Sequence, residues 1–206
     1  MWDLTKNKSI CVYPYVHKHH NLDENEGFCC FTNENYGRIG QDNTAGRQEV
    51  IDTMQKGLPV KGCDICYTKE SEGHISPRIE KTKQWIERYG EPEQVKFQWF
   101  DIRNDDTCNL KCKYCGPWSS SLWKKELNIP VTRKKQIEIT DDEIAQCHSW
   151  YQAGGEPFLN QPFLDIILRF AEINPSAEIT INTNLSNVSN KWLEALSKLT
   201  NLTITA

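Results

Sequence analysis

The sequence lacks any long apolar run. Hydrophobic residues make up 38% of its 206 positions, and no stretch approaches the roughly 20 consecutive apolar residues that cross a membrane. The segment from Met1 to Lys6 also lacks the apolar core of a secretion signal. These two absences argue against a membrane partner and predict a cytoplasmic protein.

Basic charge is sparse as well. The chain has 24 Lys and Arg against 28 Asp and Glu, a formal net charge of −4, with dense basic spots only at 124–125 and 133–135. Because phosphate backbones are held by basic patches, nucleic acid is not an expected partner, and a role in RNA or nucleoside modification is disfavoured. Solvated surface is the better interpretation of the two basic spots.

A disulfide scaffold is not expected either. The nine cysteines stand in a chain without a secretion signal, and cytosolic thiols stay reduced. An odd number leaves at least one cysteine unpaired in any disulfide scheme. Metal binding explains this cysteine content better, with Cys147 interpreted as a small core residue in a helix.

Three of the cysteines lie on one short loop. Cys108, Cys112 and Cys115 follow one another within eight residues, and thiolates select zinc, copper(I) or iron–sulfur clusters over hard cations. The nearest flanking cysteines are Cys66 and Cys147, so no fourth thiolate lies close in the sequence. Three ligands leave one position of the metal open; a structural zinc loop is the alternative.

A second motif, Gly-Gly-Glu-Pro at residues 154–157, ends a short apolar run. The cysteine loop, with an aromatic residue before its last cysteine, and this Gly-Gly turn together resemble the radical S-adenosylmethionine (radical SAM) superfamily. The segment 115–123, the N-terminal cysteines and the residues Ser-Pro-Arg at 76–78 resemble its twitch- or SPASM-containing branch.

The resemblance implies cofactors and a reaction. A [4Fe–4S] cluster reductively cleaves S-adenosylmethionine to start radical chemistry, with an electron from a reductant such as a flavodoxin or ferredoxin. The implied cluster ligands are Cys108, Cys112 and Cys115, and the implied S-adenosylmethionine contacts are Tyr114, Gly154, Gly155, Glu156 and Asn184. A plain strand-end turn is the alternative for the two glycines. Leu185 stands where the family often has Gly, so strand-end capping is an equal alternative for Asn184.

The N-terminal cysteines form a second set. Cys63 and Cys66 have the spacing of a metal knuckle, and the resemblance implies a second iron–sulfur cluster, with structural zinc or no metal as alternatives. Adjacent cysteines rarely chelate one metal, so one of the two cysteines at 29 and 30 is expected. The implied ligands are Cys11, Cys30, Cys63 and Cys66. The histidines at 17, 19 and 20 are interpreted as a solvated polar loop.

Hydrophobic periodicity predicts an α/β fold. Strands are expected at 95–103, 150–153, 178–182 and 202–206, with Val95, Phe97 and Trp99 on one face of the first. Helices are expected at 121–127, from residue 141, at 162–173 and at 191–199. The first ninety residues are predicted to be irregular, with one helix at 46–56 and another capped by Ser76, whose buried face is Ile79, Thr82, Ile86 and Tyr89.

Alternating strands and helices predict parallel βα units, with chemistry at the carboxyl ends of the strands. We therefore expect a partial parallel (βα) barrel of the radical SAM type at 93–206, truncated after its fourth strand. A small cysteine-bearing, mostly irregular and helical region at 1–92 precedes it. The missing half is expected as a separate chain or a longer protein.

Two classes of function follow. The leading hypothesis is a radical SAM enzyme acting on a peptide or protein substrate, because the resemblance to relatives with auxiliary clusters favours it. The alternative is a catalytically inert iron–sulfur, zinc-binding or partner-binding module, since the predicted barrel is incomplete.

Overall fold

Parallel strands form the sheet that carries the cysteine loop. The structure is a computed structural model that describes residues 2–32, 34, 37, 41–103, 105–131 and 137–206. Within this part, the strands β3 (Trp99–Ile102), β4 (Ser149–Gln152), β5 (Glu178–Asn182) and β6 (Leu202–Thr205) pair in that order, each parallel to the next. Their carboxyl ends therefore meet at one edge of the sheet.

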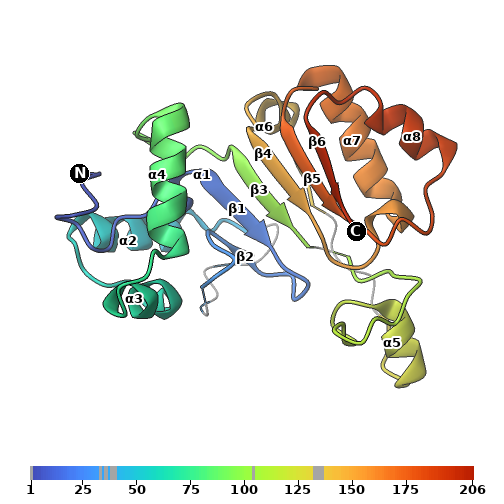
Figure 1. Cartoon of the computed structure of the whole chain (residues 1–206), viewed down its shortest axis with the longest axis horizontal. Coiled ribbons are helices and arrows are strands. Elements are labelled where there is room, and N and C mark those ends of the chain that lie inside the picture. Colours follow the sequence, from blue (N-terminus) through green and yellow to red (C-terminus); the bar gives the residue numbers. More distant parts are fainter. Residues whose placement is uncertain (1, 33, 35–36, 38–40, 104, 132–136) are drawn as a thin grey trace. The chain divides into compact units, whose positions relative to one another are not determined.

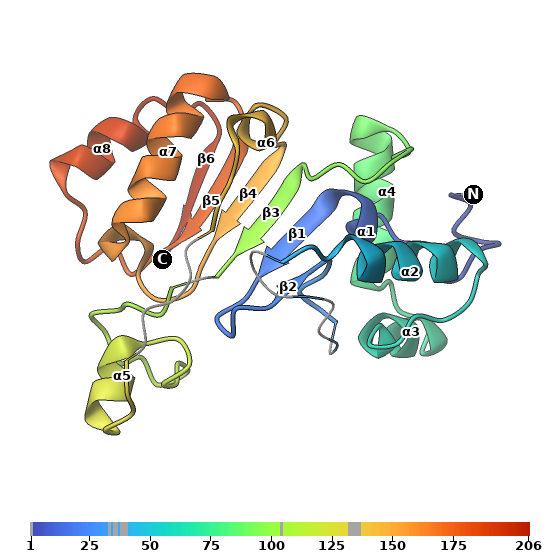
Figure 2. The same cartoon turned by 180° about the vertical axis from the view of Figure 1, so that it is seen from behind.

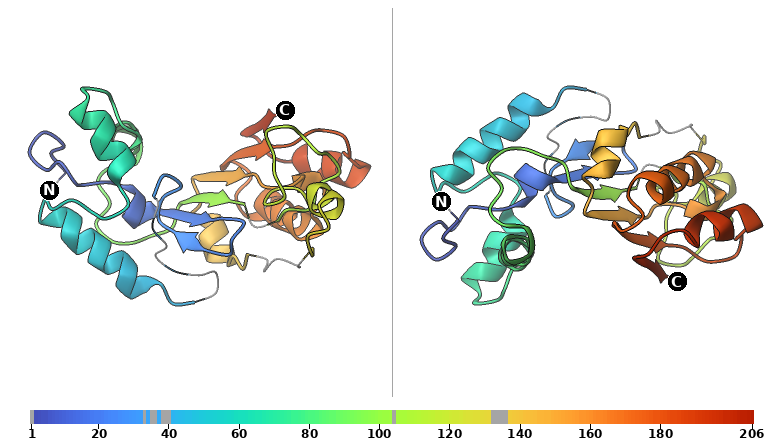
Figure 3. Two further views of the ribbon diagram at one scale, coloured as in Figure 1. Left: turned by 90° about the horizontal axis from the view of Figure 1, so that it is seen from below. Right: turned by 90° about the horizontal axis from the view of Figure 1, so that it is seen from above.

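Helices fill each connection between these strands. The elements are α5 (Ser121–Glu126) and α6 (Asp141–Ala145) before β4, the 3-10 helix η1 (Pro157–Leu159) and α7 (Gln161–Ile173) before β5, and α8 (Asn190–Leu196) before β6. Figures 1 and 2 show α7 and α8 on one face of the sheet, and Figure 3 shows these two helices side by side. This βα order confirms the predicted fold class, a part of a (βα) barrel.

The core of this sheet lies beneath α7. Phe100, Trp150 and Phe170 are fully buried, and the Trp150 ring lies 5.5 Å from the centres of both phenylalanine rings. The prediction for the first strand was wrong in its start and its face. Val95 is 39% exposed and lies outside β3, and the buried residues of β3 are Phe100, Asp101 and Ile102.

Local capping signals fixed several helix ends as predicted. Thr140 and Glu143 form a complete capping box at the start of α6. Ser76 caps α4 (Pro77–Tyr89) by accepting the Ile79 N–H at 3.2 Å, and Gly90 ends that helix at φ +83°. Among the helices that the structure describes, none has the length and apolar character required to cross a bilayer.

The chain divides into two units. One comprises Met1–His19 with Asn25–Phe97, and the other comprises His20–Glu24 with Gln98–Ala206. The elements before Phe97 are α1 (Tyr13–Val16), β1 (His17–His20), β2 (Glu26–Gly27), α2 (Thr44–Gln55), α3 (Asp64–Ser71) and α4. The helices α2 and α4 were predicted, whereas α1 and α3 were missed. The domain boundary expected after residue 92 stays a prediction.

The histidine-rich segment was predicted wrongly. His17, His19 and His20 lie in β1 and are at most 9% exposed, so they do not form a solvated loop. The His17 ring is held by a 2.8 Å hydrogen bond between Nδ1 and the Phe28 carbonyl. Its edge also faces the Tyr13 ring, with ring centres 4.7 Å apart. These two contacts let the His17 ring be buried despite its polarity.

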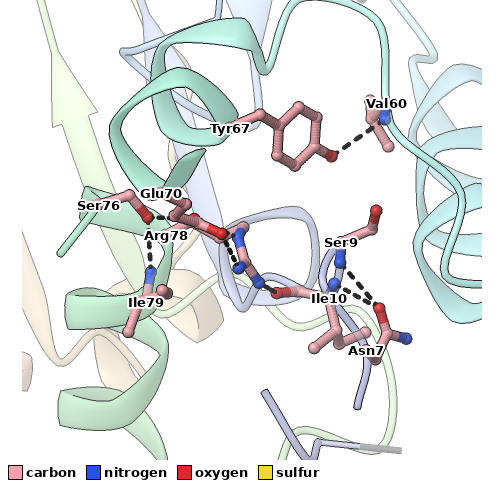
Figure 4. Close-up of polar contacts among 9 residues, drawn as sticks. All are labelled: Asn7, Ser9, Ile10, Val60, Tyr67, Glu70, Ser76, Arg78 and Ile79. Carbon is pink, nitrogen blue, oxygen red and sulfur yellow. Dashed lines mark hydrogen bonds and ion pairs between the residues drawn. The ribbon is translucent and has the colours of Figure 1, made fainter. Parts of the chain in front are cut away.

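The buried face of α4 also differs from the prediction, because it contains a charge. Arg78, Thr82 and Trp85 are buried, whereas Tyr89 is exposed. Figure 4 shows how the Arg78 guanidinium is compensated: it forms a fork with the Glu70 carboxylate and donates to the Ile10 carbonyl at 2.7 Å. A buried cation is tolerated where a carboxylate and a carbonyl accept its hydrogen bonds in this way.

Candidate functional site

The cysteine loop and the Gly-Gly turn lie against each other. The loop follows the carboxyl end of β3, and the turn follows the carboxyl end of the neighbouring strand β4 (Figure 1). Their backbones are joined by the Glu156 N–H, which donates to the Thr107 carbonyl at 2.7 Å. The parallel sheet thus brings together two motifs that are about forty residues apart in the sequence.

The first turn of α5 holds the cysteine loop in place. The Cys108 N–H donates to Ser121 Oγ at 3.0 Å, and that hydroxyl donates back to the Cys108 carbonyl at 3.2 Å. The Trp123 indole N–H donates to the Cys112 carbonyl at 3.1 Å, and the Cys115 N–H donates to the same oxygen, also at 3.1 Å. The backbone around the thiols is therefore fixed by residues that the motif itself does not include.

The three thiols of the loop influence one another. Burial raises the pKa of Cys108, the Leu110 N–H on its sulfur lowers it, and Glu156, Cys112 and Cys115 raise it further. Within the described residues, no group of three His, Cys, Asp or Glu side chains is arranged as a closed metal site. The fit of a cluster rests instead on the donor set, because three soft thiolates on one short loop suit iron–sulfur.

Tyr114 stands on the outside of this loop. Its side chain is 87% exposed, and a hydrogen bond with the Cys112 thiol, followed by the charges of Cys112, Cys115 and Cys108, raises its pKa. Its ring therefore lies beside the thiols and is open to solvent. The predicted contact of Tyr114 with S-adenosylmethionine stays a prediction.

The two glycines of the turn are needed for packing inside the protein. A Cβ added at Gly155 would lie 2.2 Å from the Thr107 oxygen, and one added at Gly154 would lie 2.7 Å from the Asp105 oxygen. Gly154 also has φ +86°, which side chains disfavour. Their small size thus lets the turn approach the backbone that leads into the cysteine loop. Their predicted binding of S-adenosylmethionine remains to be tested.

Glu156 is a buried connector between two strand ends. It is 2% exposed, and its Oε1 accepts the Phe158 N–H at 3.0 Å and the Thr183 hydroxyl at 2.5 Å. Its Oε2 accepts the Asn184 N–H at 2.7 Å. The carboxylate therefore fixes the backbone that follows β5 to the Gly-Gly turn that follows β4.

The turn after β5 carries backbone strain. Leu185 has φ +56°, in the left-handed region that favours Gly, at the position where the resemblance expects Gly. The Thr183 hydroxyl stabilises this strained backbone conformation by accepting a hydrogen bond from the Leu185 N–H at 3.0 Å. Leu185 in place of Gly therefore keeps the backbone shape of the turn, at the cost of a strained conformation.

Leu185→Gly should stabilise the protein by roughly 0.5–1 kcal/mol, because relief of the left-handed strain exceeds the added chain entropy of Gly. Urea unfolding of the metal-free protein measures this change. Leu193→Gly, in the interior of α8 at a similarly exposed leucine, is the control and should destabilise it by about 1 kcal/mol. A loss of stability in Leu185→Gly would contradict the strain argument.

Several N-terminal cysteines influence one another's pKa, and one of them, Cys66, contacts the start of α4. The Cys66 thiol interacts with the Ser76 hydroxyl and the Arg78 N–H, and its charge and that of Cys63 raise the pKa of Cys11. The Cys29 thiol is hydrogen-bonded to Cys30, and the charge of Cys11 raises its pKa too. The structure therefore brings segments carrying Cys11, Cys29, Cys63 and Cys66 together. The predicted ligand Cys30 is the immediate neighbour of Cys29.

Burial raises the pKa of Cys11 from 9.0 to about 12, and burial likewise raises that of Cys63 to about 12. A raised pKa in the folded state contributes stability that is fully present below about pH 9 and is lost as the pH rises toward 12. The metal-free, reduced protein should therefore lose on the order of 2–4 kcal/mol across this window from Cys11 alone. Urea unfolding at several pH values measures the slope.

Cys11→Ala should flatten this alkaline slope, whereas Val12→Ala, which shortens a neighbouring buried side chain that has no proton to lose, is the matched control and should keep the slope. An equal slope in the Cys11 variant and the wild-type chain would contradict the assignment. The remaining cysteine, Cys147, is 2% exposed and lies just after α6. Its predicted role as a core residue is confirmed, but its place inside a helix is not.

Residues 106–205 match the sequence model of the Radical SAM superfamily. This part of the chain, which holds the cysteine loop and the Gly-Gly turn, is therefore a radical SAM domain. The family implies a [4Fe–4S] cluster and S-adenosylmethionine as cofactors, in agreement with the sequence analysis. No solved structure matches the chain.

The most informative relatives are GTP 3',8-cyclases. The enzyme of Limosilactobacillus fermentum is 33% identical over 88 residues, which cover 38% of this chain and 24% of that protein. The enzyme of Streptomyces coelicolor is 29% identical over 83 residues, with the same two shares. Human molybdenum cofactor biosynthesis protein 1 is 21% identical over 136 residues, 58% of this chain and 20% of that protein.

The chain thus spans about a quarter or less of the length of these three relatives. The matches support the interpretation of this protein as a radical SAM enzyme in general. They do not show the twitch or SPASM branch, a peptide substrate or a second metal centre.

Proposed function

We propose that this protein is a radical SAM enzyme whose active site forms where β3, β4 and β5 end. The observation that carries the proposal is the contact of the cysteine loop with the Gly-Gly turn at one edge of a parallel sheet. It is supported by the family match over the same residues. When bound, the cluster would supply the electron that cleaves S-adenosylmethionine.

The chain's own residues would hold and orient these groups. Cys108, Cys112 and Cys115 are the proposed ligands of the cluster, since three thiolates leave one iron open for the cofactor. Glu156 fixes the turn after β5 relative to the Gly-Gly turn, so that both present a constant backbone surface. Such preorganised backbone is what a positioned cofactor requires.

The N-terminal cysteines form the second part of the proposal. We assign to Cys11, Cys63, Cys66 and one of Cys29 or Cys30 a second metal centre, an iron–sulfur cluster or zinc. It is supported by the electrostatic influence of Cys63 and Cys66 on Cys11 and of Cys11 on Cys29. A peptide or protein substrate is proposed on the same N-terminal resemblance, whereas the similarity to GTP 3',8-cyclases points to GTP.

The proposal is tested by anaerobic reconstitution with iron and sulfide. We expect a [4Fe–4S] spectrum that changes on addition of S-adenosylmethionine, and 5′-deoxyadenosine when a flavodoxin or ferredoxin system supplies electrons. The triple variant Cys108→Ala, Cys112→Ala, Cys115→Ala should keep only the N-terminal metal. Equal iron and sulfide in this variant and the wild-type chain would refute the assignment.

Substrate class is tested in the same system. GTP and a set of peptides are supplied in parallel, and deuterium-labelled substrate would transfer its label to 5′-deoxyadenosine. Label transfer from GTP and from no peptide would overturn the peptide proposal and leave the radical SAM assignment intact. If neither cluster nor 5′-deoxyadenosine forms, the inert metal-binding or partner-binding module becomes the better account.

A further inference from the structure

A closed ring of three hydrogen bonds joins the cysteine loop to the turn after β5. The Asn109 amide donates to Ser186 Oγ at 2.7 Å, and the Ser186 hydroxyl donates to Asn184 Oδ1 at 2.5 Å. The Asn184 amide closes the ring by donating to Asn109 Oδ1 at 3.0 Å. Each side chain donates to one partner and accepts from the other, so the ring is complete.

This ring connects parts of the chain that are 75 and 77 residues apart. Asn109 directly follows Cys108, and the other two residues lie in the strained turn that contains Leu185. Asn109 and Ser186 are exposed, so their polar groups could bond to water at almost no cost to stability. Global folding therefore gives no strong reason for the three side chains to meet.

The position of the ring does give a reason. One member adjoins a proposed cluster ligand, and another is the predicted cofactor contact Asn184. A cofactor held by both the cysteine loop and the turn after β5 needs these two segments in one fixed register. Small displacements of positioning groups are costly when a reactive molecule must be aligned.

We propose that Asn109 is a positioning residue that sets the cysteine loop in register with the turn at residues 183–186 and so prepares the S-adenosylmethionine site. The inference rests on the proposed radical SAM function. It assigns Asn184 a part in this ring, through its side chain, in addition to the backbone bond with Glu156.

The first test uses the metal-free protein and needs no cofactor. In Asn109→Ala, hydrogen exchange of the backbone amides in the cysteine loop should be about 5- to 10-fold faster, because the loop loses its tie to the turn. Asn187→Ala removes another exposed amide side chain of the same turn and is the matched control. Unchanged exchange in Asn109→Ala would overturn the proposal.

The second test measures S-adenosylmethionine binding to the reconstituted protein by anaerobic calorimetry. Asn109→Ala should weaken affinity about tenfold, with iron and sulfide content and the unfolding midpoint close to wild type. Ser186→Ala should behave alike, and the double variant should be little worse than either single one, because the ring fails as a unit. Additive effects, or faster exchange with equal affinity, would show that Asn109 has no positioning role.

The two proposals fail in different ways. If the wild-type protein takes up no cluster, the proposed function is wrong, and the exchange experiment still decides whether the ring holds the loop. If the wild-type protein binds cluster and cofactor normally and Asn109→Ala does the same, only the positioning role of Asn109 is wrong.

Discussion

Gly155→Ala should prevent the cysteine loop from closing against β4 and should abolish cluster uptake. The added Cβ would lie 2.2 Å from the Thr107 oxygen and 2.9 Å from the carbonyl carbon of Asp106. Both contacts are with backbone, which cannot rotate away as a flexible side chain can. The segment that leads into Cys108 must therefore move as a whole.

The displaced segment has little freedom to adjust. The Glu156 N–H is bonded to the Thr107 oxygen at 2.7 Å, and the Thr107 N–H is bonded to Asp105 Oδ1, also at 2.7 Å. Overpacking of a well-packed site costs about 1–3 kcal/mol, and loss of the backbone bond adds roughly 1 kcal/mol. A total near 3 kcal/mol is a large part of the stability of an ordinary domain.

Urea unfolding of the metal-free protein and iron content after reconstitution measure the two consequences of Gly155→Ala. The matched control is Gly27→Ala, where the added Cβ would meet its first neighbour, the Cys29 oxygen, only at 3.8 Å. The control should keep wild-type stability to within about 1 kcal/mol and should keep its iron. Normal cluster content in Gly155→Ala would show that the turn does not support the loop.

Much of the fold was predictable because its signals are local. The cap residues Ser76 and Thr140 mark helix starts by hydrogen bonds to backbone three residues away, so their neighbours in the sequence suffice to find them. The alternation of β5 is equally local, and its predicted bounds are those of the structure. These features depend on the next few residues, which the sequence displays directly.

The features that shape the site depend on distant partners instead. Glu156 meets Thr183 across 27 residues, and Asn109 meets Ser186 across 77. No periodicity in the sequence predicts such pairs. Taken alone, each of these side chains indicates only a polar surface residue or a turn residue. The serines at 119 and 120 were an available clue to this segment, because Ser120 caps α5 and Ser121, the first residue of that helix, bonds to Cys108.

Glu156→Ala should destabilise the protein by about 3 kcal/mol and loosen the turn after β5. The carboxylate accepts two backbone N–H groups, from Phe158, which is buried, and from Asn184, which is half-buried, and both lose their acceptor when it is removed. Each buried donor left without an acceptor costs roughly 1–3 kcal/mol, and the cavity adds to this. The exposed Glu194→Ala is the control and should change stability by less than about 0.5 kcal/mol.

Glu156→Gln separates charge from shape, because the amide has nearly the same size but presents a donor to the Asn184 N–H. We expect an intermediate loss of about 1–2 kcal/mol from that donor–donor contact. The substitution also removes a negative charge that raises the pKa of Cys108. The pH midpoint for alkylation of Cys108 in the metal-free protein should therefore fall.

Two effects of Glu156 act on that midpoint, and comparison of the two variants separates them. Loss of the charge lowers the midpoint in both variants, whereas loosening exposes the thiol and lowers it further in Glu156→Ala, because burial raises the pKa of Cys108. Because a thiolate is the form that binds iron, cluster uptake at neutral pH should then begin faster in Glu156→Gln than in the wild-type chain. An unmoved midpoint would mean that the Glu156 carboxylate acts on the cysteine loop only through the backbone that it holds.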